Sequence, residues 1–372
     1  MNSQFIYTPF SEVFKWCQKS NIGSRQGKSD GKYKLYIASG KDFKYYDEYL
    51  EEGESLVFGT GGNPCIHYVT GRFAYTNHCE AAQKKRNDVC TKFYYYYFQK
   101  DSFAQLRSTF VGGGIKNSSK KKIGSLLVPV PPLPEQKRIV ARIEELFSQL
   151  DAGVAELQAA KKRLKVYRQA VLKEAFEDIQ NIVPFGEIME SRLGKMLDKQ
   201  KNKGIPRKYL RNINVRWFSF DLSDLLKMRI DEDEIEKYSI HKGDLVICEG
   251  GEPGRCAVWM EDEPIFYQKA LHRIRFTVLA EPKFYMYYLW FAAQTGQLQK
   301  YFTGTGIKHL TGQSLVKIPV PFTDIRTQRE ILSIIESRLS VCDSIEKTID
   351  TALQQAEALR QSILKQAFEG KL

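Results

Sequence analysis

Several stretches of the sequence hold residue types that could carry out chemistry, but each lacks part of the pattern that the chemistry needs. Gly59-Thr-Gly-Gly-Asn-Pro64 and Gly112-Gly-Gly114 lack the spacing and the Gly-Lys-Ser/Thr ending of a phosphate-binding loop. Asn63-Pro64-Cys65 differs from the Asn-Pro-Pro-aromatic signature of methyltransferases that act on adenine. No nucleophile-elbow, zinc-protease or paired nuclease carboxylate cluster stands out in the sequence. The sequence therefore predicts a protein that binds a partner and is not an enzyme.

The cysteines and histidines show no metal-site or disulfide pattern. The seven cysteines are odd in number and include no Cys-x-x-Cys pair, so we expect reduced, mostly buried thiols. His78, which precedes Cys79, and His272 are candidate ligands, but neither has a partner at metal-site spacing. We therefore expect no metal and no cofactor bound by this chain.

Composition and charge narrow the class of protein. The 372 residues carry a net charge of +12, and 42% of them are hydrophobic, which is enough for two packed domains joined by further structure. Such a basic chain suggests a polyanionic partner. No apolar run approaches the roughly 20 residues of a membrane span, and the N-terminus lacks a secretory profile. We expect a cytoplasmic protein with no membrane partner.

The elements that must position a binding surface occur twice in the sequence. Arg168–Glu177 is repeated as Arg360–Glu369, at an offset of 192 residues. In the same register, Phe110-Val-Gly-Gly-Gly-Ile-Lys116 matches Phe302-Thr-Gly-Thr-Gly-Ile-Lys308. The further matches are Pro9-Phe10 with Pro184-Phe185, Leu56–Pro64 with Leu245–Pro253, Phe93–Phe98 with Phe284–Leu289, and Val128–Pro131 with Ile318–Pro321.

The repeated segments at the end of each copy have the periodicity of long helices. Apolar residues recur in a heptad-like pattern, after the proline-rich starts Pro129–Pro134 and Pro319–Pro321, and Thr327–Glu330 has the form of a capping box. About 40 helical residues would span roughly 60 Å. Each apolar stripe needs a partner, so we expect the two helices to pair antiparallel as a coiled-coil spacer. The predicted stripes are Ile139, Ile143, Leu146, Leu150, Leu157, Leu164, Tyr167 and Val171, and Ile331, Ile335, Ile345, Ile349, Leu359 and Ile363.

The globular parts have the pattern of mixed α/β (α+β) domains. Short β-rich runs such as Leu56–Phe58, Leu245–Ile247 and Ile274–Val278 are separated by Gly, Asn and Pro turns. The tyrosine-rich runs Tyr94–Tyr97 and Tyr285–Tyr288 could stack on bases, but their helical spacing favours packing against a core. The predicted fold is two copies of an α/β domain separated by two antiparallel coiled-coil helices, related by a pseudo-two-fold internal repeat.

The chain resembles the specificity subunit of type I restriction–modification systems. The resemblance rests on Leu133-Pro-Glu-Gln136, the repeated Arg-Gln-x-hydrophobic-Leu-Lys-x-Ala-Phe-Glu blocks and the closing Phe368-Glu-Gly-Lys-Leu372, and covers essentially the whole length. The second start, Pro321–Gln328, lacks the Leu-Pro-Glu-Gln form, which weakens any role carried over to it. The resemblance implies target-recognition domains at 1–128 and 179–318, and spacer helices with their proline-led starts at 129–178 and 319–372.

In that family, each target-recognition domain recognises one half of a bipartite, asymmetric site in double-stranded DNA, and the helices set the gap. The resemblance implies that two methyltransferase subunits dock on this non-catalytic chain and that a restriction (translocase) subunit can join. S-adenosylmethionine, ATP and Mg²⁺ are then expected on those partners. Two alternatives stay open: a coiled-coil protein-interaction scaffold, and a self-contained divergent DNA methyltransferase. Methyl transfer by the pure chain would favour the enzyme, and no DNA binding even with partners present would favour the scaffold.

Candidate DNA-binding residues are polar side chains on turns, for base edges, and neighbouring Lys and Arg, for phosphates. In the first copy they are Ser39, Lys41, Thr60, Asn63, Asn77, His78, Lys116, Lys120, Lys121 and Lys122. In the second copy they are Lys201, Lys203, Arg207, Arg211, Asn212, Asn214, Arg216, Glu252, Arg255, Gln268, Lys269 and Lys308.

Overall fold

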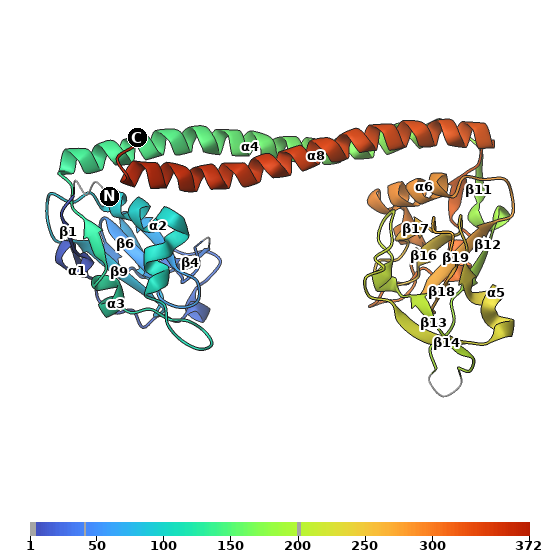
Figure 1. Cartoon of the computed structure of the whole chain (residues 1–372), viewed down its shortest axis with the longest axis horizontal. Coiled ribbons are helices and arrows are strands. Elements are labelled where there is room, and N and C mark those ends of the chain that lie inside the picture. The colour runs from blue at the N-terminus through green and yellow to red at the C-terminus, as the bar shows by residue number, and fades with distance from the viewer. Residues whose placement is uncertain (1–4, 41, 199–201) are drawn as a thin grey trace. The chain divides into compact units, whose positions relative to one another are not determined.

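The computed structural model describes residues 5–40, 42–198 and 202–372 and divides into two compact units (Figure 1). Unit 1 comprises Met1–Gln158 and Asp350–Leu372, and unit 2 comprises Ala159–Ile349. Each unit therefore contains one globular domain together with part of each long helix. Among the described residues, no helix combines the length and the apolarity needed to cross a bilayer.

The globular domain of unit 1 is built from two four-stranded sheets and a two-stranded ribbon. One sheet has the order β2-β9-β6-β7 and is antiparallel, and the other has the order β4-β3-β8-β5 with β3 parallel to β8. The ribbon pairs β1 with β10. The strands are β1 (Tyr7–Pro9), β2 (Phe14–Trp16), β3 (Tyr33–Tyr36), β4 (Phe43–Tyr46), β5 (Glu51–Glu52), β6 (Ser55–Gly59), β7 (Cys65–Val69), β8 (Arg72–Tyr75), β9 (Cys79–Lys84) and β10 (Leu127–Pro129), and the helices are α1 (Phe10–Val13), η1 (Ser24–Gln26), α2 (Thr91–Ser108) and α3 (Lys120–Gly124).

The globular domain of unit 2 repeats this topology strand for strand. Its sheets have the orders β12-β19-β16-β17 and β14-β13-β18-β15, with β13 parallel to β18, and its ribbon pairs β11 with β20. The predicted internal repeat and mixed α/β class are therefore confirmed. The strands are β11 (Ile182–Pro184), β12 (Met189–Leu193), β13 (Ile205–Leu210), β14 (Leu226–Ile230), β15 (Ser239–Ile240), β16 (Leu245–Cys248), β17 (Cys256–Val258), β18 (Ile265–Tyr267), β19 (Leu271–Phe276) and β20 (Pro319–Pro321), and the helices are η2 (Phe185–Glu187), η3 (Asn212–Asn214), η4 (Glu232–Glu234), α5 (Ile235–Tyr238), α6 (Pro282–Gln294), η5 (Gln297–Tyr301) and α7 (Gly312–Leu315).

The long helices α4 (Leu133–Glu177) and α8 (Ile325–Phe368) pair antiparallel within each unit. In unit 1, Ile139 and Ile143 near the start of α4 share a core with Leu364 near the end of α8. In unit 2, Phe176 at the end of α4 shares a core with Ile335 near the start of α8. The pairing predicted from the apolar stripes is thus confirmed in both units.

Equivalent ion pairs fasten the helices to each other. In unit 2 an Arg168 Nη atom lies 2.6 Å from a carboxylate oxygen of Asp343. In unit 1, at the 192-residue offset, Arg360 pairs with Asp151 and lies over the ring of Phe147 at 4.3 Å. The duplication therefore extends to side-chain contacts, not only to backbone topology.

Two details of the long helices differ from the prediction. Tyr167, Ile345 and Leu359 are exposed although they fall in the predicted stripes. A straight helix drifts relative to a strict heptad repeat, so its buried stripe moves to other positions along the length. The cap of α8 is Asp324 rather than a box starting at Thr327, because Asp324 accepts hydrogen bonds from the Thr327 backbone N–H and hydroxyl.

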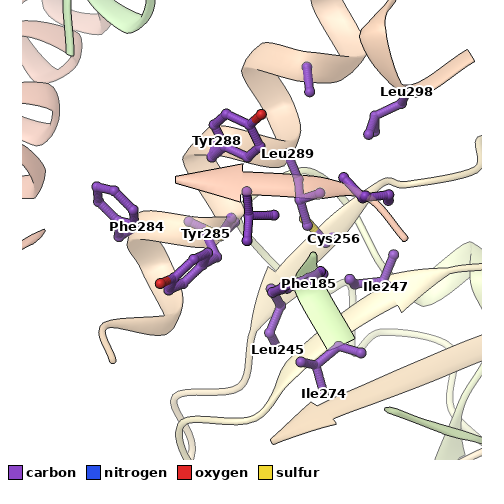
Figure 2. Close-up of a cluster of buried hydrophobic side chains, with 14 of the residues drawn as sticks. Phe185, Leu245, Ile247, Cys256, Ile274, Phe284, Tyr285, Tyr288, Leu289 and Leu298 are labelled. Atoms are coloured by element: carbon purple, nitrogen blue, oxygen red, sulfur yellow. The ribbon is translucent and has the colours of Figure 1, made fainter. Parts of the chain in front are cut away.

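Both cores pack the aromatic helix of the domain between its sheet and the long helices. Figure 2 shows the core of unit 2, where Tyr285 and Tyr288 of α6 lie with Phe185 and Leu245. Phe176 of α4 packs edge-on against Tyr288 at 5.4 Å between ring centroids, and Phe368 of α8 packs against Tyr97 of α2 at 5.3 Å in unit 1. The tyrosine runs are core elements, as predicted, and are not available to stack on bases. Burying one such aromatic side chain contributes about 2 kcal/mol.

A buried glutamine connects each long helix to the aromatic helix of its domain. Gln136 Oε1 accepts from the Cys90 N–H, the N-cap of α2, at 2.8 Å, and the Gln136 amide is fully buried. Gln328 Oε1 accepts from the Glu281 N–H, the N-cap of α6, at 2.9 Å. The second copy has lost the Leu-Pro-Glu of the first but keeps the glutamine in register, so the structural role survives the sequence change.

Candidate nucleic-acid interface

Four chain segments meet at one end of the unit 1 domain, where most of the predicted residues lie. The Thr60 N–H donates to the His78 carbonyl at 2.8 Å, and the Ser118 N–H donates to the Thr60 carbonyl at 2.8 Å. The Gly62 N–H donates to the Lys116 carbonyl at 3.0 Å. We call this surface the loop end of unit 1, and it comprises residues 37–40, 60–64, 76–78 and 111–118.

The equivalent segments meet in unit 2 through equivalent hydrogen bonds. The Glu249 N–H donates to the Ala270 carbonyl at 2.9 Å, and the Leu310 N–H donates to the Glu249 carbonyl at 2.7 Å. The Asn212 side-chain amide donates to the Gly250 carbonyl at 2.9 Å. The loop end of unit 2 comprises residues 211–214, 249–255, 268–270 and 303–310.

A glycine-rich loop closes each loop end with the same geometry. Val111 and Asn117 exchange two backbone hydrogen bonds of 3.0 Å, and Thr303 and His309 exchange two of 2.8 and 2.9 Å. The loop turns through a glycine with positive φ in both copies, Gly112 (142°) and Gly304 (93°). Side chains other than glycine rarely adopt this backbone conformation, which explains why both copies keep a glycine there.

The structure brings six of the predicted residues of unit 1 together on its loop end: Ser39, Thr60, Asn63, Asn77, His78 and Lys116. Asn77, His78 and Lys116 are exposed there. Lys121 and Lys122 lie on α3, immediately after the loop end, with Lys121 exposed and Lys122 half-buried. Lys41 lies outside the described residues.

Lys120 differs from the prediction. Its Nζ atom lies 3.1 Å from a Glu80 carboxylate oxygen and 3.1 Å from the Cys17 carbonyl oxygen, and its side chain is 31% exposed. An ammonium group that is already paired and hydrogen-bonded gains less from a phosphate than an exposed one. We therefore assign Lys120 to the packing of α3 and keep Lys121 and Lys122 as phosphate candidates.

In unit 2, the structure places seven predicted residues on the loop end: Arg211, Asn212, Glu252, Arg255, Gln268, Lys269 and Lys308. The Arg255 guanidinium links two of its segments, because it donates to Glu252 Oε2 at 2.9 Å and to the Asn212 carbonyl at 3.0 Å. Arg211 is held by Asp224 at 2.6 Å. These charged side chains are therefore held in position by the protein.

Asn214 and Lys203 of unit 2 lie in surroundings that differ from those of the other predicted residues. Asn214 is 2% exposed and its side chain donates to the carbonyls of Asp221 and Asp224, so it holds the loop together. Lys203 precedes β13, whereas Arg211 follows it, and a strand of this length spans about 17 Å. Lys203 thus lies away from the loop end.

The remaining predicted residues of unit 2 are set back from the loop end. Arg207 lies within β13, with its guanidinium 5.6 Å from the centroid of the Phe266 ring. Arg216 is exposed and lies 3.5 Å from an Asp221 carboxylate oxygen. Lys201 lies outside the described residues.

Three buried polar atoms of the unit 2 loop end still need a partner. Within the part of the chain that the structure describes, Asn212 Oδ1, Arg211 Nε and Arg255 Nε are buried and have no hydrogen-bond partner. Buried polar atoms in native proteins are nearly always paired, with protein groups or with ordered water. These unpaired donors and this unpaired acceptor are compatible with a surface that completes its hydrogen bonds on a polar partner.

The thiols and histidines take structural roles. Cys17, Cys65, Cys79, Cys90, Cys248, Cys256 and Cys342 are all free, as expected, and five of them are buried. Burial raises the pKa of Cys79 to about 12 and that of Cys248 to about 11, so these thiols stay protonated. His272 is buried and its Nε2 lies 3.2 Å from the Leu310 carbonyl oxygen. No group of three His, Cys, Asp or Glu side chains suited to a metal is found among the described residues.

The comparisons with known proteins identify the family. The family model described as "Type I restriction modification DNA specificity domain" matches residues 8–161 and again residues 182–355. The chain belongs to this family. Both matches of the type I specificity family begin near the ribbon of a domain and run into its following long helix, so the family unit coincides with the internal repeat.

Curated members of the type I specificity family match at low identity. The EcoKI specificity subunit of Escherichia coli K12 is 26% identical over 289 residues, covering 72% of this chain and 62% of that protein. The EcoBI specificity subunit of Escherichia coli is 25% identical over 376 residues, covering 90% of this chain and 78% of that protein. The chain thus spans less than two thirds of the length of the EcoKI subunit.

Solved structures show the same fold. A chain from a study of complex assembly and conformational transition in the type I R-M system superposes with a TM-score of 0.80 at 16% identity, covering 100% of this chain and 99% of that one. The HsdS subunit of Thermoanaerobacter tengcongensis superposes with a TM-score of 0.59 at 16% identity, covering 100% and 98%. The fold is therefore shared although most side chains differ.

Sequence analysis missed several residues of the loop ends. Asn117 and His309 occupy the same position of the two glycine loops, and Glu249 occupies the position of Thr60. The internal repeat held the necessary signal, because positions that differ inside a repeated motif are candidates for a difference in specificity. Asn117 and His309 are 192 residues apart, and Thr60 and Glu249 are 189 residues apart.

Proposed function

We propose that this chain is the DNA sequence-specificity subunit of a type I restriction–modification complex and that it is not itself an enzyme. Each globular domain is a target-recognition domain that reads one half of a bipartite, asymmetric site in double-stranded DNA. The observation that carries the proposal is the pair of loop ends, which share a backbone frame and differ in the side chains mounted on it.

The proposed division of contacts follows from the chemistry of DNA. Base edges are read by side chains that donate and accept hydrogen bonds, and the loop ends offer Asn77 and His78 in unit 1 and Asn212 and Arg255 in unit 2. Phosphates are contacted by cations, and Lys116 and Lys308 are exposed beside those groups. Because the side chains differ between the units, the two half-sites they recognise differ as well.

Partners supply the chemistry in this proposal. Two methyltransferase subunits dock on the chain, a restriction subunit can join, and these subunits bind S-adenosylmethionine, ATP and Mg²⁺. The chemical steps then take place on adenine bases that this chain has selected. The relatives named as specificity subunits of type I restriction enzymes support this division of labour.

The long helices set the number of base pairs between the two half-sites. Helix pairs held within each unit by ion pairs and apolar packing are stiff, and a duplex presents the same groove again every 34–36 Å or so. Inserting four residues after Ala159 in α4, with a matching insertion in α8, should therefore change the spacer and leave both half-sites intact.

The test is genome-wide mapping of methylated adenines in a host that expresses this chain with its methyltransferase subunits. We expect one bipartite motif that disappears when the chain is omitted, and a motif with altered spacing for the insertion variant. Motif loss with retained methylation activity would argue against the spacer role. Methyl transfer by the pure chain would contradict the non-catalytic assignment, and failure of the assembled complex to bind DNA would favour a protein scaffold.

A further inference from the structure

Each glycine loop carries a large apolar side chain at its tip. Ile115 is 78% exposed and Ile307 is 74% exposed, and they correspond at the 192-residue offset. Isolated exposed apolar residues are common on protein surfaces and need no explanation by themselves. The same exposed apolar residue at the same place in both loops, among positions that differ between the copies, does need one.

The loops hold these tips outward. The base of each loop is closed by a pair of backbone hydrogen bonds, between Val111 and Asn117 and between Thr303 and His309. The Ile115 carbonyl oxygen folds back so closely on Gly112 that a Cβ there would lie 3.0 Å from it, and the Ile307 carbonyl packs against Gly304 in the same way. With the isoleucine carbonyl turned toward the loop base, the side chain is presented to solvent.

The tip is constant where its surroundings vary. Gly114-Ile115-Lys116 and Gly306-Ile307-Lys308 are identical, whereas the loop differs at 111 and 303, at 113 and 305, and at 117 and 309. Side chains that read different half-sites must differ between the units. A residue that stays the same at this surface is therefore suited to a feature that both half-sites share, which is the duplex itself.

The chemistry beside the tip favours DNA. A lysine follows each isoleucine, and both Lys116 and Lys308 are exposed. In unit 2, Ile307 and Lys308 line an open hollow of about 650 Å³ together with Glu252 and Phe302, so the constant tip and a unit-specific residue face the same space. A ligand in that hollow would meet an apolar tip, a cation and a specificity group at once.

We propose that Ile115 and Ile307 insert into a groove of the bound duplex, as a sequence-independent contact that seats each domain on its half-site. Apolar side chains that enter a groove contact sugars and the edges or faces of bases, and they act independently of hydrogen-bond patterns. The adjacent lysines contact the flanking phosphates. This inference rests on the proposed function, because it presupposes that the loop ends face DNA.

The test measures DNA affinity of the complete complex with its methyltransferase subunits. Ile115→Ala and Ile307→Ala should each weaken binding about tenfold, both to a duplex that carries the target and to an unrelated duplex. The salt dependence of binding should stay unchanged in these variants, and it should decrease in Lys308→Gln. The methylated motif should be the same as in the wild type.

Leu279→Ala is the matched control. Leu279 is 75% exposed, close to the exposure of Ile307, and follows the end of β19 that is opposite to the loop end. We expect this variant to bind both duplexes like the wild type. A loss equal to that of Ile307→Ala would overturn the proposal, because it would show a general effect of apolar truncation.

Each of the remaining outcomes would overturn either the inference or the proposed function. Wild-type affinity in both isoleucine variants would overturn the inference and leave the proposed function intact. An altered base preference in one half-site would mean that the tip reads sequence, and defective assembly with normal affinity of the assembled fraction would mean that it contacts a methyltransferase subunit; either result would overturn the inference. Failure of the wild-type complex to bind DNA would instead overturn the proposed function, and the inference with it.

Discussion

The two loop ends differ in the side chains that they carry, although their segments are joined by equivalent backbone hydrogen bonds. In unit 1 the surface is formed mainly by neutral polar groups, Thr60, Asn77 and Asn117, with His78. In unit 2 the equivalent surface contains a network in which Arg255 links Glu252 to the backbone at Asn212. A common frame can therefore carry either mainly neutral groups or a network of charged groups, and specificity can change without any change of fold.

The largest expected effect comes from making the two units alike. Replacing the domain of unit 2, residues 179–318, by the corresponding sequence of unit 1 should give a target whose two halves have the same sequence. The common topology makes the exchange compatible with the ribbon and with the packing of Phe176 against the aromatic helix.

Methylation mapping of the cells checks this prediction. The wild-type chain, expressed from the same plasmid, is the control. If the second half-site persisted after the exchange, the specificity would reside outside the exchanged domain, and the comparison of loop ends would lose its meaning.

The buried glutamines Gln136 and Gln328 should contribute similar amounts of stability to the two units. Gln136→Leu and Gln328→Leu each leave buried backbone groups without partners, at a cost of about 1–3 kcal/mol. We expect both variants to lower the unfolding temperature of the complex by similar amounts, a few degrees.

Thermal unfolding of the assembled complex measures both effects, and Gln354→Leu, at an exposed position of α8, is the control. A large effect at Gln136 with none at Gln328 would show that the second copy no longer depends on its glutamine. In that case the presence of Gln328 at the position equivalent to Gln136 would have no structural consequence.

Substitutions of the neighbouring residues Lys120 and Lys121 should distinguish a lysine that contacts DNA from one that forms an internal ion pair. Lys121→Gln should reduce the slope of binding affinity against salt concentration by about one, because an exposed cation releases a counterion on contacting phosphate. Lys120→Gln should leave that slope nearly unchanged, since Lys120 already pairs with Glu80.

Salt titrations of DNA binding by the assembled complex distinguish these lysines. Both variants carry the same change of charge and are one residue apart, so each serves as the control for the other. Equal slopes for the two variants would show that the structural distinction between them has no effect on binding.

The smallest expected effect is a dependence of folding stability on pH, and it involves both units. Burial lowers the pKa of His67 in unit 1 and of His272 in unit 2 below the ordinary value of 6.5. The unfolded chain then takes up protons that the folded chain resists, so stability is present above about pH 6.5 and falls as the pH drops below it.

Protonation puts a charge on each buried ring and should loosen the segment that the ring contacts, which contains Ile37 and Ser39 for His67 and Leu310 for His272. Hydrogen exchange at pH 7.5 and 5.5 should show a larger loss of protection around residues 303–310 than around residues 111–118. His272→Gln should remove this difference. A loss confined to unit 1 would contradict the assignment.

Much of the architecture was predictable because it depends on local periodicity and on repetition in the sequence. The 192-residue offset and the heptad-like stripes indicated two domains and two long helices, and both are observed. The helical spacing of the tyrosine-rich runs also predicted that the tyrosines pack in the core. The exposed positions Ile345 and Leu359 were missed because the drift of a straight helix depends on its actual partner and not on the pattern alone.

The candidate site was predictable only in outline. Polar turns rich in Lys and Arg pointed to the loop ends, and most of the chosen residues lie there. Asn214 and Lys120 were indistinguishable in sequence from exposed neighbours, because their partners, Asp224 and Glu80, come from other segments. Burial and pairing are properties of the assembled loops.

The amino-acid sequence by itself determined that this protein is duplicated, that paired helices follow each domain, and that its task is to bind. These features depend on residue type and spacing along one chain. The tertiary structure decided which turns meet, which cations stay free and which side chain stands at each loop tip. Hydrogen bonds between distant segments, such as those that join Thr60 to His78 and Glu249 to Ala270, make those choices, and no local pattern encodes them.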